Sequence, residues 1–176
     1  MTSLTKIYYS GHIRDGSKIA IKDMVSSDVE DWYEIFNSST EYETTRMKLA
    51  DAKDYFKSRL GMPGCLDLVA KIDKTLVGYR GLTIFADESR HVAITSGVYT
   101  HSSFRRKGIA VLMINVSEEI AKQNGVRLCH GYTLATNKPT IELYTKKLGY
   151  VICGSLSKAA KMDSTYVDII ILCKEL

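Results

Sequence analysis

Apolar residues recur with helical or strand-like spacing along most of the chain. From 108 to 123 they return every three or four positions, which predicts an amphipathic helix that Asn124-Gly125 ends. The apolar face of this helix consists of Ile109, Leu112, Met113, Val116 and Ile120. Ser117, Glu118 and Lys122 lie off that face.

The remaining segments alternate between the two periods, which predicts a mixed α/β chain. Helices are expected over 26–37, 50–60 and 108–123. A further short helix is expected to start at Asn137 and to extend to Leu148. Strands are expected over 18–22, 66–72, 76–85, 92–100, 126–133 and 166–173. Two stretches show neither period: we expect residues 1–15 to be loosely attached and 154–164 to form a long hairpin connection.

Length and composition indicate one domain, 1–176. The 176 residues contain no internal repeat, linker or low-complexity tract. A chain of this size buries roughly 70% of its unfolded surface, enough for a sizeable core. No run approaches the roughly 18 apolar residues of a membrane span, and the polar start lacks the apolar centre of a signal peptide. We therefore expect a cytoplasmic protein with no membrane partner.

The segment from Arg105 to Ala110 has the chemistry of a pyrophosphate site. It lies between a predicted strand and the start of the 108–123 helix, whose first N–H groups have no partner within the helix. Arg105, Arg106 and Lys107 raise the local potential, and Gly108 lets an anion approach the backbone. A bare basic helix start facing solvent has the same residues, so the surrounding sequence must decide between the two interpretations.

Two blocks of sequence resemble the GCN5-related N-acetyltransferases. The first, Phe104-Arg105-Arg106-Lys107-Gly108-Ile109-Ala110, is similar to the family's Q/R-x-x-G-x-G/A pyrophosphate loop. The second begins at Asn137, continues through Ile141-Glu142-Leu143-Tyr144, and ends in Lys147-Leu148-Gly149-Tyr150; it differs from the family's block by Thr140 in place of alanine. Both blocks stand in the family's order, with a helix and a strand between them.

The resemblance implies an α/β fold with about seven strands and about four helices, and an acetyl-CoA cosubstrate. The cofactor-binding residues it implies are Val98, Thr100, Arg105, Arg106, Lys107, Gly108, Ile109, Ala110 and Asn137. The pantetheine arm is expected between strands 92–100 and 127–134, held by main-chain groups near Val98 and Thr100. Tyr144 is expected to protonate the leaving thiolate, with packing on the sheet as its alternative role. Asn137 either contacts the cofactor or caps its helix.

The general base and the amine acceptor are not specified by these motifs. Strand 92–100 contains no acid, which leaves Glu88, His91 or a backbone-held water as the base. Without an obvious base the site favours an α-amine, because that group is neutral near pH 7 far more often than a lysine amine is. A peptide N-terminus, a lysine, a polyamine and a small amino compound all remain candidates. Glu41 and Glu43 either attract a cationic amine, with Tyr42 covering it, or are ordinary solvated loop residues.

Other classes of function receive little support from the sequence. The cysteines at 65, 129, 153 and 173 form no C-x-x-C pair and are expected to be small buried residues. The histidines show no ligand spacing, so no metal is expected. The net charge of +4 is mild, and no aromatic-basic stripe indicates a nucleic-acid partner. The main alternative to an enzyme is a silent acyl-CoA-binding module, and either a monomer or a homodimer is compatible with the sequence.

Overall fold

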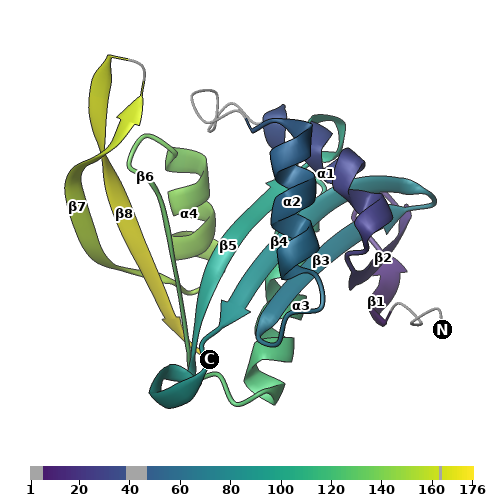
Figure 1. The fold of residues 1–176 in the computed structure, drawn as a ribbon, viewed down its shortest axis with the longest axis horizontal. Helices are drawn as coiled ribbons and strands as arrows, with labels where there is room; N and C mark the ends of the chain where they lie inside the picture. Colours follow the sequence, from purple (N-terminus) through teal and green to yellow (C-terminus); the bar gives the residue numbers. More distant parts are fainter. Residues whose placement is uncertain (1–5, 39–46, 163) are drawn as a thin grey trace. The chain divides into compact units, whose positions relative to one another are not determined.

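The computed structural model describes residues 6–38, 47–162 and 164–176 (Figure 1). The chain divides into two compact units, Met1–Thr83 with Ser96–Ile120, and Ile84–Thr95 with Ala121–Leu176. Strand β5 (Val92–Thr100) and helix α3 (Ile109–Gln123) each contribute residues to both units. The mixed α/β fold expected from the sequence is confirmed, with eight strands and four α-helices in the described part of the chain. The single domain stays a prediction.

The first unit is an antiparallel meander that continues into β5, in the order β1-β2-β3-β4-β5. The four strands before β5 are β1 (Ile7–His12), β2 (Lys18–Asp23), β3 (Cys65–Ile72) and β4 (Thr75–Ile84). Short turns join the paired strands: residues 13–17 connect β1 to β2, and Asp73, with its left-handed φ of 52°, lies in the β3–β4 turn. These turns are tight because antiparallel neighbours need only a few connecting residues.

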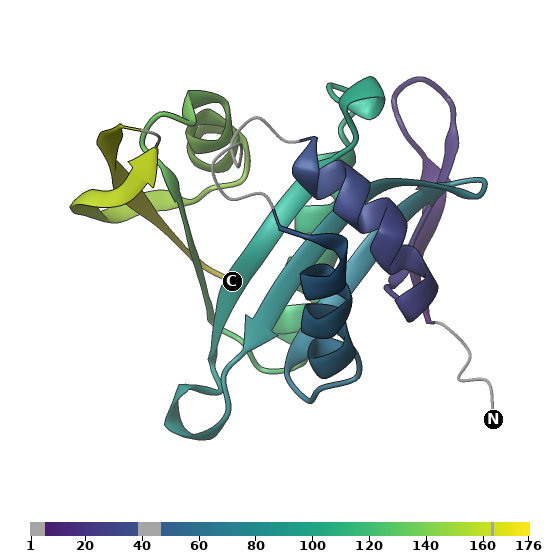
Figure 2. The same cartoon turned by 45° about the horizontal axis from the view of Figure 1, so that its top comes forward.

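Helices cover both faces of this part of the sheet (Figures 1 and 2). Helices α1 (Val29–Asn37) and α2 (Leu49–Arg59) pack Trp32 and Phe56 on the face that includes Val69. Helix α3 packs Ile109 and Met113 on the opposite face, against Leu68, Ala70 and Val77. Neighbouring residues of β3 point to opposite faces, so Leu68, Val69 and Ala70 alternate between the two cores. Full burial of a side chain such as Phe56 contributes roughly 1.5–3 kcal/mol.

Gly78 allows the start of α3 to lie close to β4. A Cβ at this position would come within 2.9 Å of the Met113 sulfur and 3.1 Å of Ile109 Cγ2. Both neighbours belong to the first two turns of α3. The close approach that only glycine permits therefore fixes where the helix begins relative to β4.

The second unit contains the first residues of β5, then β6 (Leu128–Leu134), β8 (Thr165–Glu175) and β7 (Val151–Met162), in that order across the sheet. Strand β6 runs parallel to β5 over three registered pairs, Val92–Leu128 to Ile94–His130, and antiparallel to β8 over its whole length. Helix α4 (Lys138–Lys147) contacts β7. Gly131 faces Thr95 so closely that a Cβ there would clash with the threonine hydroxyl oxygen.

Several sequence-based expectations need correction. The segment 7–12, expected to be loosely attached, is β1, because its backbone pairs with β2. The expected connection 154–164 lies mostly within β7, which extends to Met162. Ser117 and Glu118 are buried, although they lie off the apolar stripe of α3. The burial of Ser117 follows from the buried Arg80 of β4, because the Arg80 Nε donates a hydrogen bond to Ser117 Oγ at 3.1 Å.

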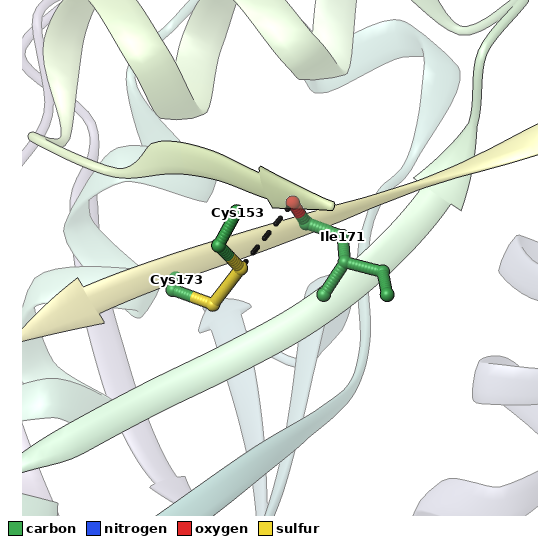
Figure 3. The surroundings of a disulfide bond; sticks show 3 residues. All are labelled: Cys153, Ile171 and Cys173. Carbon is green, nitrogen blue, oxygen red and sulfur yellow. Dashed lines mark hydrogen bonds between the residues drawn. A yellow bond between two sulfur atoms is a disulfide. The ribbon is translucent and has the colours of Figure 1, made fainter. Parts of the chain in front are cut away.

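The cysteines also differ from the prediction. Cys129 is buried as expected, but Cys65 is half-buried and Cys153 forms a disulfide with Cys173 (Figure 3). Cys153 is the extra residue of a bulge, because Ile152 pairs with Leu172 and Gly154 already pairs with Ile171. The Cys153 sulfur also lies 3.6 Å from the Ile171 carbonyl oxygen, a contact without a shared proton because a disulfide sulfur has none to donate. The pairing was missed because β7 was not predicted.

Candidate functional site

The connection from β5 to α3 is a short ordered segment. His101 N–H donates to the Val77 carbonyl at 3.0 Å, which ties the end of β5 to β4. A single 3-10 turn, η4 (Ser102–Phe104), follows, and the His101 ring nitrogen accepts a hydrogen bond from Ser103 N–H at 3.3 Å. The sequence motif therefore leaves β5 through a capped turn rather than a loose loop, and His101, which the sequence analysis did not single out, supplies the cap.

Two residues of the motif have left-handed backbone conformations just before the helix starts. Arg106 has a φ of 68° and Gly108 a φ of 89°, both in the left-handed region. Such alternation is typical of concave turns in which successive N–H groups bind an anion. Leu112 N–H donates to the Gly108 carbonyl at 3.0 Å, so the N–H groups of 109–111 precede the first helical hydrogen bond of α3. The geometry is that of an anion site at a helix start.

The charges around this helix start also favour an anion. The first turn of α3 contains no acidic residue, although helices commonly place one there to complement the macrodipole. Arg105 and Arg106 are exposed, and Arg105 Nε donates to the Thr100 carbonyl at 3.3 Å. Lys107 Nζ lies 4.9 Å from the centre of the Phe104 ring. The predicted cluster of Arg105, Arg106, Lys107 and Gly108 is therefore brought together at one end of α3.

Two residues of the β1–β2 turn approach this cluster, and the sequence analysis did not name them. Lys107 Nζ forms an ion pair with Asp15 Oδ2 at 2.8 Å. The Arg14 Nε lies 3.8 Å from the position that a Cβ on Gly108 would occupy. The lysine lowers the pKa of Asp15 to about 2, mainly by its hydrogen bond and then with help from Ser17. No sequence pattern identifies this contact, because a charged turn in a hairpin is common.

Strand β5 contains the residues expected to hold the pantetheine arm. Val98 and Thr100 are half-buried in its last three residues. Gly97, just before them, has a φ of 127°, and a Cβ there would lie 2.8 Å from the Tyr99 ring. The regular β5–β6 pairs end at Ile94. The Thr100 carbonyl already accepts from Arg105, so its N–H group and the groups of Val98 are the better candidates for binding.

Asn137 and Tyr144 lie at the two ends of the short helix α4, in the second unit. The Asn137 side chain accepts a hydrogen bond from Thr140 N–H at 3.3 Å, which confirms its role as a helix cap; cofactor contact stays a prediction. Tyr144 is buried, and its ring packs edge-on against Tyr150 with centroids 4.8 Å apart. The N–H groups of Leu148 and Tyr150 both donate hydrogen bonds to the Tyr144 carbonyl. The packing role is therefore present, and the acid role remains to be tested.

The proposed bases and acceptor residues are less well defined. Glu88 lies in an exposed 3-10 turn (Asp87–Ser89), and the exposed His91 precedes β5. All nine residues of β5 lie along the chain between these two residues and the motif. Glu41, Tyr42 and Glu43 lie outside the described residues. Within the described ranges, no group of three or more His, Cys, Asp or Glu residues could hold a metal ion.

A separate polar cluster ties α2 to the sheet. Arg59 Nε donates to both carboxylate oxygens of Asp67 at 2.9 Å, and its other nitrogens reach Thr83 and Ser96. Tyr79 O–H donates to Asp67 at 2.6 Å. Burial raises the pKa of Tyr79 well above 10, and the charge of Asp67 and their hydrogen bond add to that effect. Every group in the cluster has a partner, so the cluster is structural.

The fold is similar to those of known acetyltransferases. An N-acetyltransferase from Staphylococcus aureus Mu50 has a TM-score of 0.78 at 18% identity, over 89% of this chain and 98% of that one. A ribosomal-protein-alanine N-acetyltransferase from Brucella melitensis gives 0.75 at 23%, over 89% and 99%. A putative acetyltransferase from Salmonella typhimurium, solved with its cofactor acetyl-CoA, gives 0.77 at 16%, over 90% and 94%. None of the curated proteins matches the chain in sequence.

The model of the acetyltransferase (GNAT) family matches residues 28–150, well over half of the chain. The chain therefore belongs to this family of acetyl-CoA-dependent N-acetyltransferases. The match contains both sequence blocks, the one at Arg105–Ala110 and the one from Asn137 to Tyr150. No helix among the described residues is both long and apolar enough to cross a membrane.

Proposed function

We propose that this chain transfers the acetyl group of acetyl-CoA to a primary α-amine by direct attack, with Tyr144 as general acid. The observation that carries the proposal is the backbone of the β5–α3 connection, with left-handed φ angles at Arg106 and Gly108 before an acid-free helix start. This arrangement suits a pyrophosphate, because a doubly charged group gains from both the N–H groups and the macrodipole. Val98 and Thr100 of β5 would hold the pantetheine arm through their backbone.

The chemistry requires a neutral amine and a proton for the thiolate. In the proposed step the amine nitrogen bonds to the carbonyl carbon, the carbon–sulfur bond breaks, and the departing thiolate takes the phenolic proton of Tyr144. The proton lost by the amine passes to Glu88, His91 or a water. The Tyr144 phenolate then regains a proton from solvent. An acid placed in this way contributes typically 10²–10⁴ to the rate.

An α-amine is favoured because β5 offers no acid of its own to deprotonate the acceptor. At pH 7 an α-amine with a pKa near 7.7–8.0 is neutral about one time in ten, whereas a lysine amine near 10.4 is neutral about once in two thousand. The similar fold of the Brucella protein, described as acting on a ribosomal-protein alanine, supports the same class of acceptor. A peptide N-terminus or an amino acid therefore suits a weakly assisted site best.

The test is a thiol-release assay with acetyl-CoA and matched acceptors. One peptide carries a free α-amine and no lysine, a second has a blocked N-terminus and one lysine, and spermidine serves as the polyamine. We expect turnover with the first, and a kcat/KM that rises with pH and levels off near pH 8 as the α-amine loses its proton. Turnover confined to the lysine peptide or to spermidine would reject the α-amine and keep the transferase.

The alternative function is a module that binds acyl-CoA without turning it over. Coenzyme A binding by calorimetry, together with no thiol release from any acceptor, would support this alternative. The presence of Tyr144 at the family's acid position favours the enzyme. If the chain does not bind coenzyme A at all, both functions are wrong.

A further inference from the structure

We infer that the β1–β2 turn forms part of the phosphate site, with Arg14 donating to a cosubstrate phosphate and Asp15 holding Lys107 until a phosphate replaces it. This inference rests on the proposed function, since it assumes that coenzyme A binds at the β5–α3 connection. It adds two residues that precede the family match, which begins at residue 28. Figure 2 shows the turn beside the segment that joins β5 to α3.

Arg14 lies beside the position that a phosphate at Gly108 would occupy. Its Nε is 3.8 Å from the position of a Cβ on Gly108, and glycine leaves that position empty. The arginine is exposed, and no hydrogen bond or ion pair links its guanidinium to another described residue. A planar guanidinium binds a phosphate through two parallel N–H groups, which an ammonium does not match. The side chain is therefore placed to bind an anion that also contacts the N–H groups of the helix start.

Asp15 is paired with Lys107, a cation that a phosphate at this site would also contact. Its Oδ2 accepts from Lys107 Nζ at 2.8 Å, while its Oδ1 accepts from Ser17 N–H at 3.0 Å. Because its pKa is lowered to about 2, Asp15 stays ionised at any pH at which the enzyme is assayed. A phosphate that contacts Lys107 must therefore compete with this carboxylate. Asp15 should weaken cosubstrate binding while Arg14 strengthens it.

The two neighbours are thus expected to act in opposite directions, which a purely structural turn would not do. Arg14→Ala should raise the Kd for coenzyme A by at least about fivefold, because hydrogen bonds to charged groups are stronger than neutral ones. Arg14→Lys should recover only part of this loss. Asp15→Asn should lower the Kd by about two- to fivefold, the range of an exposed ion pair. The amide keeps the oxygen that accepts from Ser17, so the turn survives.

The measurement is calorimetric binding of coenzyme A and of 3′-dephospho-coenzyme A at two salt concentrations. Controls are Lys57→Ala and Asp54→Asn, an exposed cation and an exposed acid of α2, which packs on the sheet face opposite to α3. We expect both controls to stay within about twofold of the wild type, because a distant exposed charge acts only through a screened field. Thermal melts check that each variant is folded.

The two ligands distinguish the phosphates. An Arg14→Ala loss that disappears with the dephospho ligand assigns Arg14 to the 3′-phosphate, and an equal loss with both assigns it to the pyrophosphate. The inference is wrong, and the proposed function stands, if the wild type binds coenzyme A and the Kd values of Arg14→Ala and Asp15→Asn differ from the wild-type Kd by no more than those of the controls. Equal Kd values for Arg14→Ala and Asp15→Asn would also show that the inference is wrong. Absence of binding by the wild type would overturn the proposed function and this inference together.

Discussion

The left-handed backbone at Gly108 gives the sharpest test of the anion site. A valine there would need a φ near the observed 89°, a conformation that costs an L-residue roughly 1–2 kcal/mol and a β-branched one more. The nearest atom to the new Cβ is Arg14 Nε at 3.8 Å, an ordinary contact, so no clash adds to this cost. Because the site is only half-buried, the loop can relax, and the cost should appear as lost affinity.

At about 1.4 kcal/mol per factor of ten, this strain predicts a coenzyme A affinity at least about 5- to 30-fold weaker for Gly108→Val. The matched control is Gly125→Val, which places the same side chain at a φ of 83°, with no neighbour within 4 Å, just beyond the other end of α3. Calorimetry should show weakened binding for the first variant alone, and Gly108→Asn should bind nearly as the wild type does. Equal affinities for both valine variants would show that the phosphates do not need this backbone.

Three further outcomes are expected. Tyr144→Phe should lower kcat by roughly 10²-fold or more with little change in coenzyme A affinity; unchanged turnover when chemistry limits the rate would leave Tyr144 a packing residue. Cys153→Ser should cost roughly 3 kcal/mol of unfolding free energy, from closure of a loop with a sequence separation of 20, and dithiothreitol should then have no additional effect on Tm. Tyr79→Phe should reduce the fall in unfolding free energy above about pH 10. The reason is that the folded protein keeps the Tyr79 proton that the unfolded chain loses. An unchanged slope of unfolding free energy against pH in this range would contradict this.

The sequence predicted best the elements whose faces differ in polarity. Strand β5 has the predicted bounds Val92–Thr100, and α3 begins within one residue of its predicted start. Strand β7 was missed because the side chains of Val151, Ile152 and Leu156 are exposed and no buried face produces an alternating pattern. The burial of Ser117 could not be predicted for a different reason, because its hydroxyl pairs with Arg80, a residue of β4.

The same distinction applies to the candidate site. The pyrophosphate motif is recognisable because its geometry depends on local features: a glycine with positive φ, a run of cations and a helix start. Arg14 and Asp15 have no such signature, because only the fold of the β1–β2 hairpin brings them to the motif. Tyr144 was found through resemblance, and its burial against Tyr150 could not be read from helical spacing alone.

The position of the turn outside the family match has a consequence for affinity. In the proposed site the motif at Arg105–Ala110 binds a pyrophosphate through a strained backbone, so we expect few substitutions to be tolerated there. The turn residues are exposed, and Asp15→Asn would remove a competing charge without changing a single residue of the motif. In the proposed site, an exposed turn with one cation and one anion would therefore allow cosubstrate affinity to be raised or lowered independently of the residues that position the thioester.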